Sequence, residues 1–155
     1  MEKIDSLNQV AEFHRTFNAP ILETPQIPSK ERCELRVSLL QEELNELKQA
    51  IEDNDLVEIA DALCDLQYVL SGAVLEFGLG EKFVELFNEV QRSNMSKACG
   101  TELQAQETVE HYKAKGEEAF YEKSGNKFNV HRISDNKVLK NKYYSAADLK
   151  SIIEK

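Results

Sequence analysis

Hydrophobic and polar positions alternate with a helical period over about three quarters of the chain. The pattern predicts amphipathic helices at about residues 4–18, 30–52, 56–77, 81–98 and 102–116. Prolines in APILETPQIPS separate the first two helices, and Ser29 is suited to cap the second. The DND turn at 53–55 separates the second from the third, while Gly78 and Gly116 are natural helix stops.

After Gly116 the period changes. AFYEKSGNKFNVHRIS and NKVLKNKYY carry aromatic and β-branched residues around SGN and SDN turn signals, which predict two or three short strands. Ser145 is suited to cap a last short helix. We therefore expect a mainly α fold, a bundle of four to five helices with a small C-terminal β-hairpin. Residues 1–155 form one domain in this prediction, with a helical core at 4–116 and an appendage at 117–155.

The third helix is apolar on nearly every side, which predicts a central position in the bundle. Its polar exceptions fall on one stripe, because positions three and four apart share a helix face. They are Glu58, Asp61, Asp65, Gly72 and Glu76. Within this stripe, Gly72 would let a neighbouring backbone or a ligand approach closely.

The second helix also directs acids toward its apolar side. Glu43 and Glu46 fall inside an apolar arc of roughly 200°, and Glu42 falls just outside it. Burying unpaired carboxylates costs several kcal/mol, so cations must neutralise them or some must be protonated. Oxygen ligands on rigid helices suit Mg²⁺, with Mn²⁺ as the other candidate.

Two structural alternatives account for part of this pattern. Asp55-x-x-Glu58 also has the form of a capping box, and Glu42 and Glu46 near Lys48 are compatible with a solvated helix face. Neither alternative includes Asp61 and Asp65, which lie inside the apolar third helix. The combined pattern favours a metal site.

Composition narrows the class of protein. Hydrophobic residues make up 41% of the chain and charged residues 30%, which is typical of a soluble globular protein. The net charge of −9 argues against nucleic-acid binding through a general basic surface. No apolar run reaches the roughly 20 residues of a membrane span, and the three cysteines form no CxxC pair. These features predict a cytoplasmic protein without a membrane or nucleic-acid partner.

The acidic segments carry a family resemblance. EELNE at 42–46, followed by EIAD at 58–61, resembles the EExxE…ExxD signature of the all-α nucleoside triphosphate pyrophosphohydrolases. That superfamily includes MazG-like proteins, dimeric dUTPases and phosphoribosyl-ATP pyrophosphohydrolases, and the resemblance covers about residues 4–100. It implies that Glu43, Glu46, Glu58 and Asp61 coordinate Mg²⁺. Asp65 lies outside the motif and is a candidate additional ligand or a hydrogen-bond acceptor for one.

The family also places an asparagine and a lysine of a later helix near the nucleotide. Here QRSNMSK offers Arg92, Asn94 and Lys97, of which the last two share a helix face. A phosphate contact suits the lysine and a sugar or phosphate contact suits the asparagine. The alternative is an exposed helix end with a favourable cation.

Two further segments supply candidate substrate contacts. FHRTFN at 13–18 resembles segments that approach the nucleotide in relatives, which makes His14 and Phe17 candidates for base contact. Arg36 lies two turns before Glu43 on the same face, where it forms either a structural ion pair or a phosphate contact.

The resemblance implies a Mg²⁺-dependent nucleoside triphosphate pyrophosphohydrolase. It would cleave between the α- and β-phosphates and release a nucleoside monophosphate and pyrophosphate. Glu43 or Glu46 would position or deprotonate the attacking water. One alternative is phosphoribosyl-ATP hydrolysis on the same fold. Another is a non-catalytic helical dimer or regulatory module, whose acids pair with Arg32 and Arg36 of a partner. Family members assemble as dimers or dimers of dimers, so we expect a homodimer or dimer of dimers.

Overall fold

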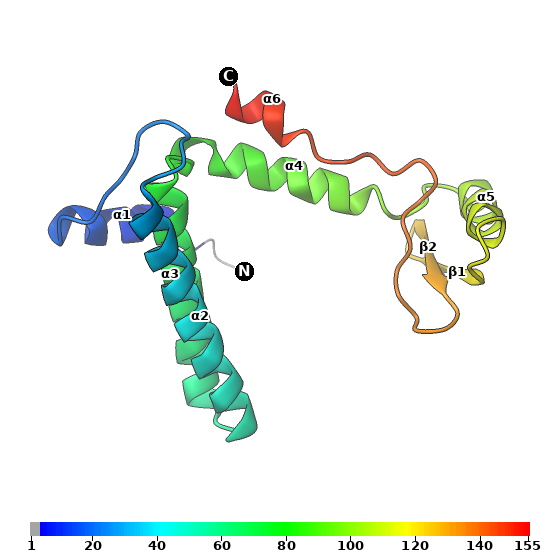
Figure 1. Cartoon of the computed structure of the whole chain (residues 1–155). Helices are drawn as coiled ribbons and strands as arrows, with labels where there is room; N and C mark the ends of the chain where they lie inside the picture. The colour runs from blue at the N-terminus through cyan, green and yellow to red at the C-terminus, as the bar shows by residue number, and fades with distance from the viewer. Residues whose placement is uncertain (1–3) are drawn as a thin grey trace. The chain divides into compact units, whose positions relative to one another are not determined.

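The computed structural model describes residues 4–155 and confirms a mainly α fold with a C-terminal β-hairpin (Figure 1). The elements are α1 (Ser6–Thr16), α2 (Lys30–Glu52), α3 (Leu56–Glu76), a 3₁₀ turn (Gly80–Lys82), α4 (Phe83–Met95), α5 (Glu102–Lys113), β1 (Ala119–Ser124), β2 (Lys127–Arg132) and α6 (Leu149–Ile153). They fall into two compact units, Met1–Phe83 and Val84–Lys155. The predicted single domain with a core at 4–116 stays a prediction.

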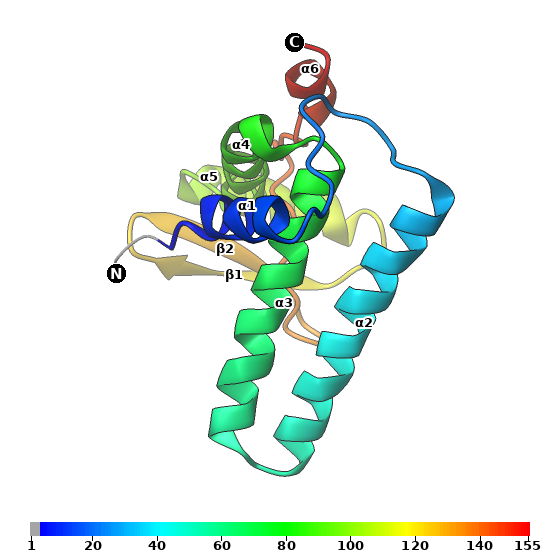
Figure 2. The ribbon, with the colours of Figure 1, turned by 90° about the vertical axis from the view of Figure 1, so that its left-hand side faces the viewer.

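In the first unit, α2 and α3 form an antiparallel hairpin (Figure 2). Each helix begins at a side chain that satisfies its free backbone amides: Ser29 caps α2 and Asp55 caps α3, as the sequence indicates. Between them Asn54 has a φ of 55°, a left-handed conformation that asparagine tolerates in tight turns. The tight turn therefore fixes one end of the hairpin.

The other end of the hairpin is covered by α1. Val10 and Ala11 of α1 pack with Leu75 of α3 in a small buried core, and Ile21 from the following loop completes it. The loop returns along α3, where the Leu22 amide donates to the Leu75 carbonyl at 3.0 Å. The Pro-rich connection thus ties α1 and the start of α2 to the end of α3.

The expectation that α3 is central and buried was wrong for the single chain. Leu56 is 77% exposed, Val57 76% and Leu63 52%. Most buried residues of α3 lie in its last two turns, where α1 crosses it. Apolar periodicity identifies a face that avoids water, but it does not say which element covers that face.

In the second unit, the β-hairpin packs on α5. Their shared core is formed by Cys99, Ala105, Val130 and Leu139. β1 and β2 are antiparallel, and Gly125 in the SGN turn has a φ of 60°, the left-handed region that glycine enters without strain. Two strands form, together with an isolated bridge between His131 and Val138, so the hairpin prediction is confirmed.

The predicted cap of the last helix was wrong. α6 begins at Leu149, and the Asp148 carboxylate accepts from the Ser151 amide at its N-terminus. Ser145 instead donates its backbone amide to the Ser96 hydroxyl at 3.0 Å. This contact with the end of α4 keeps the chain extended for three more residues.

No single helix within residues 4–155 is long and apolar enough to cross a bilayer. α3 and the segment Gly80–Met95, taken together as a bent pair, meet the criterion by length and composition.

Candidate active site

Carboxylates from α2 and α3 gather around Glu43. Burial raises the pKa of Glu43, and the negative charges of Glu46, Asp65, Glu42 and Asp61 raise it further. Its Oε2 atom is buried and has no hydrogen-bond partner among residues 4–155. An acceptor in this position favours a bound proton or a cation, because its lone pairs are otherwise uncompensated.

The acidic group is more open than the sequence indicated. Only Glu43 is partly buried, whereas the side chains of Glu46, Glu58, Asp61 and Asp65 are exposed. The group therefore lies along the rim between the two helices, where an anionic ligand and its cation have direct access. Inward-facing periodicity overstated the burial, because it identifies one side of a helix and not the element that covers that side.

Glu58 lies at the edge of this group. It occupies the first turn of α3, where its backbone amide donates to the Asp55 carboxylate at 3.2 Å. The capping role of Asp55 is thus confirmed, while the Glu58 carboxylate is exposed. Glu58 is also not among the charges that raise the pKa of Glu43. Its part in metal binding stays a prediction.

The acidic group supplies the right donor atoms for Mg²⁺ but is not arranged as a closed cage. Among the residues that the structure describes, no three His, Cys, Asp or Glu side chains are placed to hold a metal ion together. The donors are all carboxylate oxygens, one of them the unpartnered oxygen of Glu43. This donor set fits a hard divalent cation that keeps part of its water shell.

Arg36 lies in an ion pair rather than at an open phosphate site. Its guanidinium donates to the carboxylate of Glu76, and only 8% of Arg36 is exposed. Arg32 donates to the same carboxylate, with Nε 3.0 Å from Oε2. Burial alone raises the pKa of Glu76, but the hydrogen bonds from Arg32 and Arg36 outweigh it, so the net pKa is lowered. Of the two alternatives for Arg36, the structure supports the ion pair.

His14 is part of the core of the first unit. Its exposed fraction is 3%, and its Nδ1 lies 2.8 Å from the Pro20 carbonyl oxygen. Its Nε2 lies 3.4 Å from Nη2 of Arg36. Both ring nitrogens are thus used inside the chain, which favours a structural role. Phe17, the other candidate for base contact, is 66% exposed and packs on the Phe13 ring at 4.4 Å.

The three later candidates belong to the second unit. Arg92 makes two hydrogen bonds of 2.7 Å to Glu89 and a third to the Ala146 carbonyl, so its guanidinium is already engaged. Asn94 and Lys97 do share a face, because Nζ of Lys97 donates to Oδ1 of Asn94 at 2.8 Å. Their contact with a nucleotide stays a prediction.

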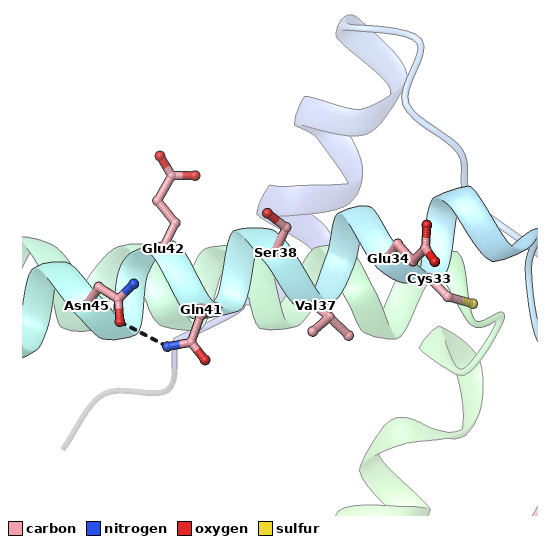
Figure 3. A pocket seen from close by; sticks show the side chains of 7 residues that line it. All are labelled: Cys33, Glu34, Val37, Ser38, Gln41, Glu42 and Asn45. Carbon is pink, nitrogen blue, oxygen red and sulfur yellow. Dashed lines mark hydrogen bonds between the residues drawn. The ribbon is translucent and has the colours of Figure 1, made fainter.

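A hollow of about 680 Å³ lies elsewhere, along a face of α2. Its lining residues all come from this helix: Cys33, Glu34, Val37, Ser38, Gln41, Glu42 and Asn45. In Figure 3 the Glu42 side chain extends away from the paired helices, in agreement with its predicted place outside the apolar arc. One helix face makes a shallow hollow, so we do not assign the substrate to it.

A helical hairpin with acids from both helices along one rim is the arrangement expected of the all-α nucleoside triphosphate pyrophosphohydrolases. Residues 10–94, more than half of the chain, match the phosphoribosyl-ATP pyrophosphohydrolase family. The chain belongs to this family, which lies within that superfamily and points to a nucleotide pyrophosphohydrolase enzyme. The match ends at Asn94, before Lys97 and the β-hairpin.

The chain is also similar to a viral protein over nearly its whole length. It is 24% identical to Uncharacterized protein L479 of Acanthamoeba polyphaga mimivirus, in an alignment that covers 99% of this chain and 97% of the relative.

Proposed function

We propose that this chain is a Mg²⁺-dependent pyrophosphohydrolase that cleaves nucleoside triphosphates between the α- and β-phosphates. The observation that supports the proposal most directly is the crowding of acids from α2 and α3 around Glu43, one of whose oxygens is buried without a partner. A triphosphate is itself highly anionic, so it needs a cation to approach such a group. Phosphoribosyl-ATP is the second candidate substrate, and the matched family favours it.

The metal would be held by carboxylates of both helices, with Mn²⁺ as a possible replacement for Mg²⁺. The ligands in this proposal are Glu43, Glu46, Glu58, Asp61 and Asp65. A bound ion of this kind supplies charge neutralisation for the leaving pyrophosphate and activates water. In the same proposal, Glu43 or Glu46 orients the attacking water and accepts its proton. Asn94 and Lys97 would contact sugar or phosphate.

The proposed partner of the chain is a second copy. Val37, Leu44 and Ile51 on α2 are 66%, 50% and 58% exposed and recur every seven residues. Leu56, Leu63 and Leu70 on α3 repeat at the same interval and are 77%, 52% and 43% exposed. Heptad spacing of large aliphatic side chains is typical of helices that pack against other helices.

Helical register places these two apolar stripes together. Each stripe lies roughly 80–140° around its helix, in the same rotational sense, from the small buried residue, Ala50 or Ala62, at the contact between α2 and α3. Because the helices are antiparallel, both stripes fall on the same side of the hairpin. The acids Glu46, Asp61 and Asp65 fall on the opposite side. A homodimer formed through the apolar side would therefore leave the acidic rim accessible, and pairing of two dimers is compatible with it.

Product analysis tests the proposed reaction. Purified protein is incubated with Mg²⁺ and a panel of ribonucleoside triphosphates, deoxynucleoside triphosphates and phosphoribosyl-ATP, and pyrophosphate and orthophosphate are measured separately. We expect pyrophosphate together with the matching monophosphate from at least one class of substrate. Release of orthophosphate alone would contradict the cleavage position, and the preferred substrate distinguishes the two candidates.

Substitution of the acids tests the assigned site. Glu46→Ala or Asp61→Ala should abolish Mg²⁺-dependent pyrophosphate release while circular dichroism shows unchanged helical content, because both side chains are exposed. Glu52→Ala is the matched control, since Glu52 lies on α2 but pairs with Lys48 on the solvent side. Full activity in either site variant would remove that residue from the metal site.

A further inference from the structure

A buried ionic cluster joins the start of α2 to the end of α3. Glu76 is 0% exposed and accepts hydrogen bonds from two α2 residues, Arg32 and Arg36. Glu76 therefore links two successive turns of α2 to the last turn of α3. The cost of removing buried charges from water offsets much of the attraction within such a pair, but an arrangement that leaves one of the charges buried and unpaired is strongly disfavoured.

The sequence of α3 makes room for this cluster. A Cβ atom at Gly72 would lie 2.7 Å from Nη1 of Arg36 and 3.0 Å from Nε2 of His14. Glycine lowers helix propensity by about 1 kcal/mol relative to alanine, so its place inside a helix indicates a steric requirement. Here that requirement is passage of the Arg36 guanidinium across α3 to Glu76.

The middle of the α2–α3 contact encloses only small side chains completely enough to count as buried. Away from the α1 crossing, the buried apolar residues of the two helices are alanines, Ala50 and Ala62, while larger apolar side chains such as Leu47 and Leu66 are only partly buried. Small and partly buried side chains interlock less than a closed core does, and sliding by one helical turn would move α2 by about 5.4 Å along α3. The hairpin register thus depends on its two ends, the capped turn at Asp55 and the cluster at Glu76.

We propose that the Arg32–Arg36–Glu76 cluster, with Gly72, positions the metal-binding carboxylates of the proposed site. Glu43 lies two turns beyond Arg36 on the same face of α2, and Asp65 lies about three turns before Glu76 on α3. The cluster and the turn hold the segment between them in the register that sets Glu43 against Asp65 and Asp61. Arg36 and Glu76 are positioning residues, and none of the cluster binds the metal itself. This inference rests on the proposed function.

Metal affinity in the absence of nucleotide tests the positioning role. Mn²⁺ binding to the full chain is measured by electron paramagnetic resonance, well below the unfolding temperature, for wild type, Glu76→Gln, Gly72→Ala and Arg32→Gln. We expect Glu76→Gln and Gly72→Ala to weaken Mn²⁺ binding by about tenfold or more, the scale on which residues behind the metal ligands act. Arg32→Gln leaves the Arg36–Glu76 pair in place, so its effect should be smaller.

Two matched controls separate positioning from general loss of stability. Glu89→Gln breaks the more exposed Arg92–Glu89 pair in the second unit, and Gly100→Ala adds a methyl group that would lie 3.4 Å from the Gln104 side chain, an ordinary contact distance. Both should bind Mn²⁺ as wild type does. Arg32 is about one-third exposed, so Arg32→Gln keeps the test decisive if the two buried substitutions prevent folding.

The outcomes distinguish this inference from the proposed function. Folded variants that lose thermal stability but bind Mn²⁺ with wild-type affinity would overturn the positioning role and leave the metal site intact. Wild-type protein that binds no Mn²⁺ would instead contradict the proposed metal site. Weaker binding in the cluster variants, with unchanged binding in both controls, would support the assignment of Arg36 and Glu76 as positioning residues.

Discussion

Glu43 is partly buried and is surrounded by other negatively charged side chains. Its raised pKa means that the folded chain holds a proton on Glu43 more tightly than the unfolded chain does. The group therefore reduces stability once it is ionised. The same property suits a metal ligand, because a cation can replace the proton and remove the repulsion.

The pH dependence of stability tests this view of Glu43. Without metal, its contribution should make stability fall as pH rises from below the ordinary value of 4.5 through the raised pKa of Glu43. Glu43→Gln should remove that part of the slope. It should also raise the metal-free melting temperature at neutral pH by on the order of 2–4 °C for each 1 kcal/mol of repulsion relieved. Thermal melts in EDTA between pH 4 and pH 8 measure both effects.

Glu52→Gln is the control, because Glu52 is an exposed residue of α2 that pairs with Lys48. If the melting temperature changes with pH in the same way in wild type and Glu43→Gln, Glu43 titrates as an ordinary surface acid.

Helical register predicted most of the acids that group around Glu43, although it left out Glu42 and included Glu58. It did not predict what Glu76 does. The spacing of three and four residues places Glu43 and Glu46 on one helix and Asp61 and Asp65 on the next, and such local arithmetic needs no tertiary information. Glu76 continues the same stripe, yet its partners lie 44 and 40 residues away. A pairing over this distance is visible only once α2 and α3 are docked.

At the scale of elements, boundaries followed the sequence where local chemistry decides them. Ser29, Asp55 and Thr101 cap their helices as their residue types indicate. Ser145 failed as a cap because hydrogen bonds from the segment to the distant α4 compete with helix formation. Local capping signals therefore predict a helix start only when the same backbone groups make no hydrogen bonds to distant parts of the chain.

Gly78 gives a prediction at this scale. It ends α3 with a φ of 68°, and a Cβ there would lie 1.9 Å from the Thr24 carbonyl oxygen. Gly78→Ala combines a strained backbone with a clash against main chain, so it should cost more than about 4 kcal/mol. Urea unfolding followed by circular dichroism measures the loss.

Gly116→Ala separates the cost of backbone strain from the cost of a steric clash. Gly116 has a φ of 80°, but a Cβ there meets nothing within 4 Å among the described residues. Only backbone strain remains, so the expected cost is about 1–2 kcal/mol. Equal losses in the two variants would show that the loop at Thr24 moves aside easily.

At the scale of the molecule, charge and apolar surface are separated on the α2–α3 hairpin. The sequence identified α3 as apolar on nearly every side, and the single chain leaves Leu56, Leu63 and Leu70 largely exposed. Periodicity therefore identified the apolar surface of α3, but it could not show that the single chain leaves this surface exposed. In the proposed homodimer a second copy would cover this surface, because two identical hairpins can pack their heptad stripes against each other.

The proposed homodimer makes Leu63, at the centre of the α3 stripe, the most informative position for substitution. We expect wild-type protein to elute with a mass about twice the 17.7 kDa of the chain in size-exclusion chromatography with light scattering. Leu63→Glu should shift the mass toward 17.7 kDa, because a dimer would bury the new carboxylate without a partner. Ile133→Glu, at a 57% exposed position of the second unit, should leave the mass unchanged. A wild-type monomer at micromolar concentration, or a Leu63→Glu dimer as stable as wild type, would place the stripes outside any interface between copies. Because the acids lie on the other side of the hairpin, a monomeric Leu63→Glu that still binds Mn²⁺ would further show that metal binding does not require the interface.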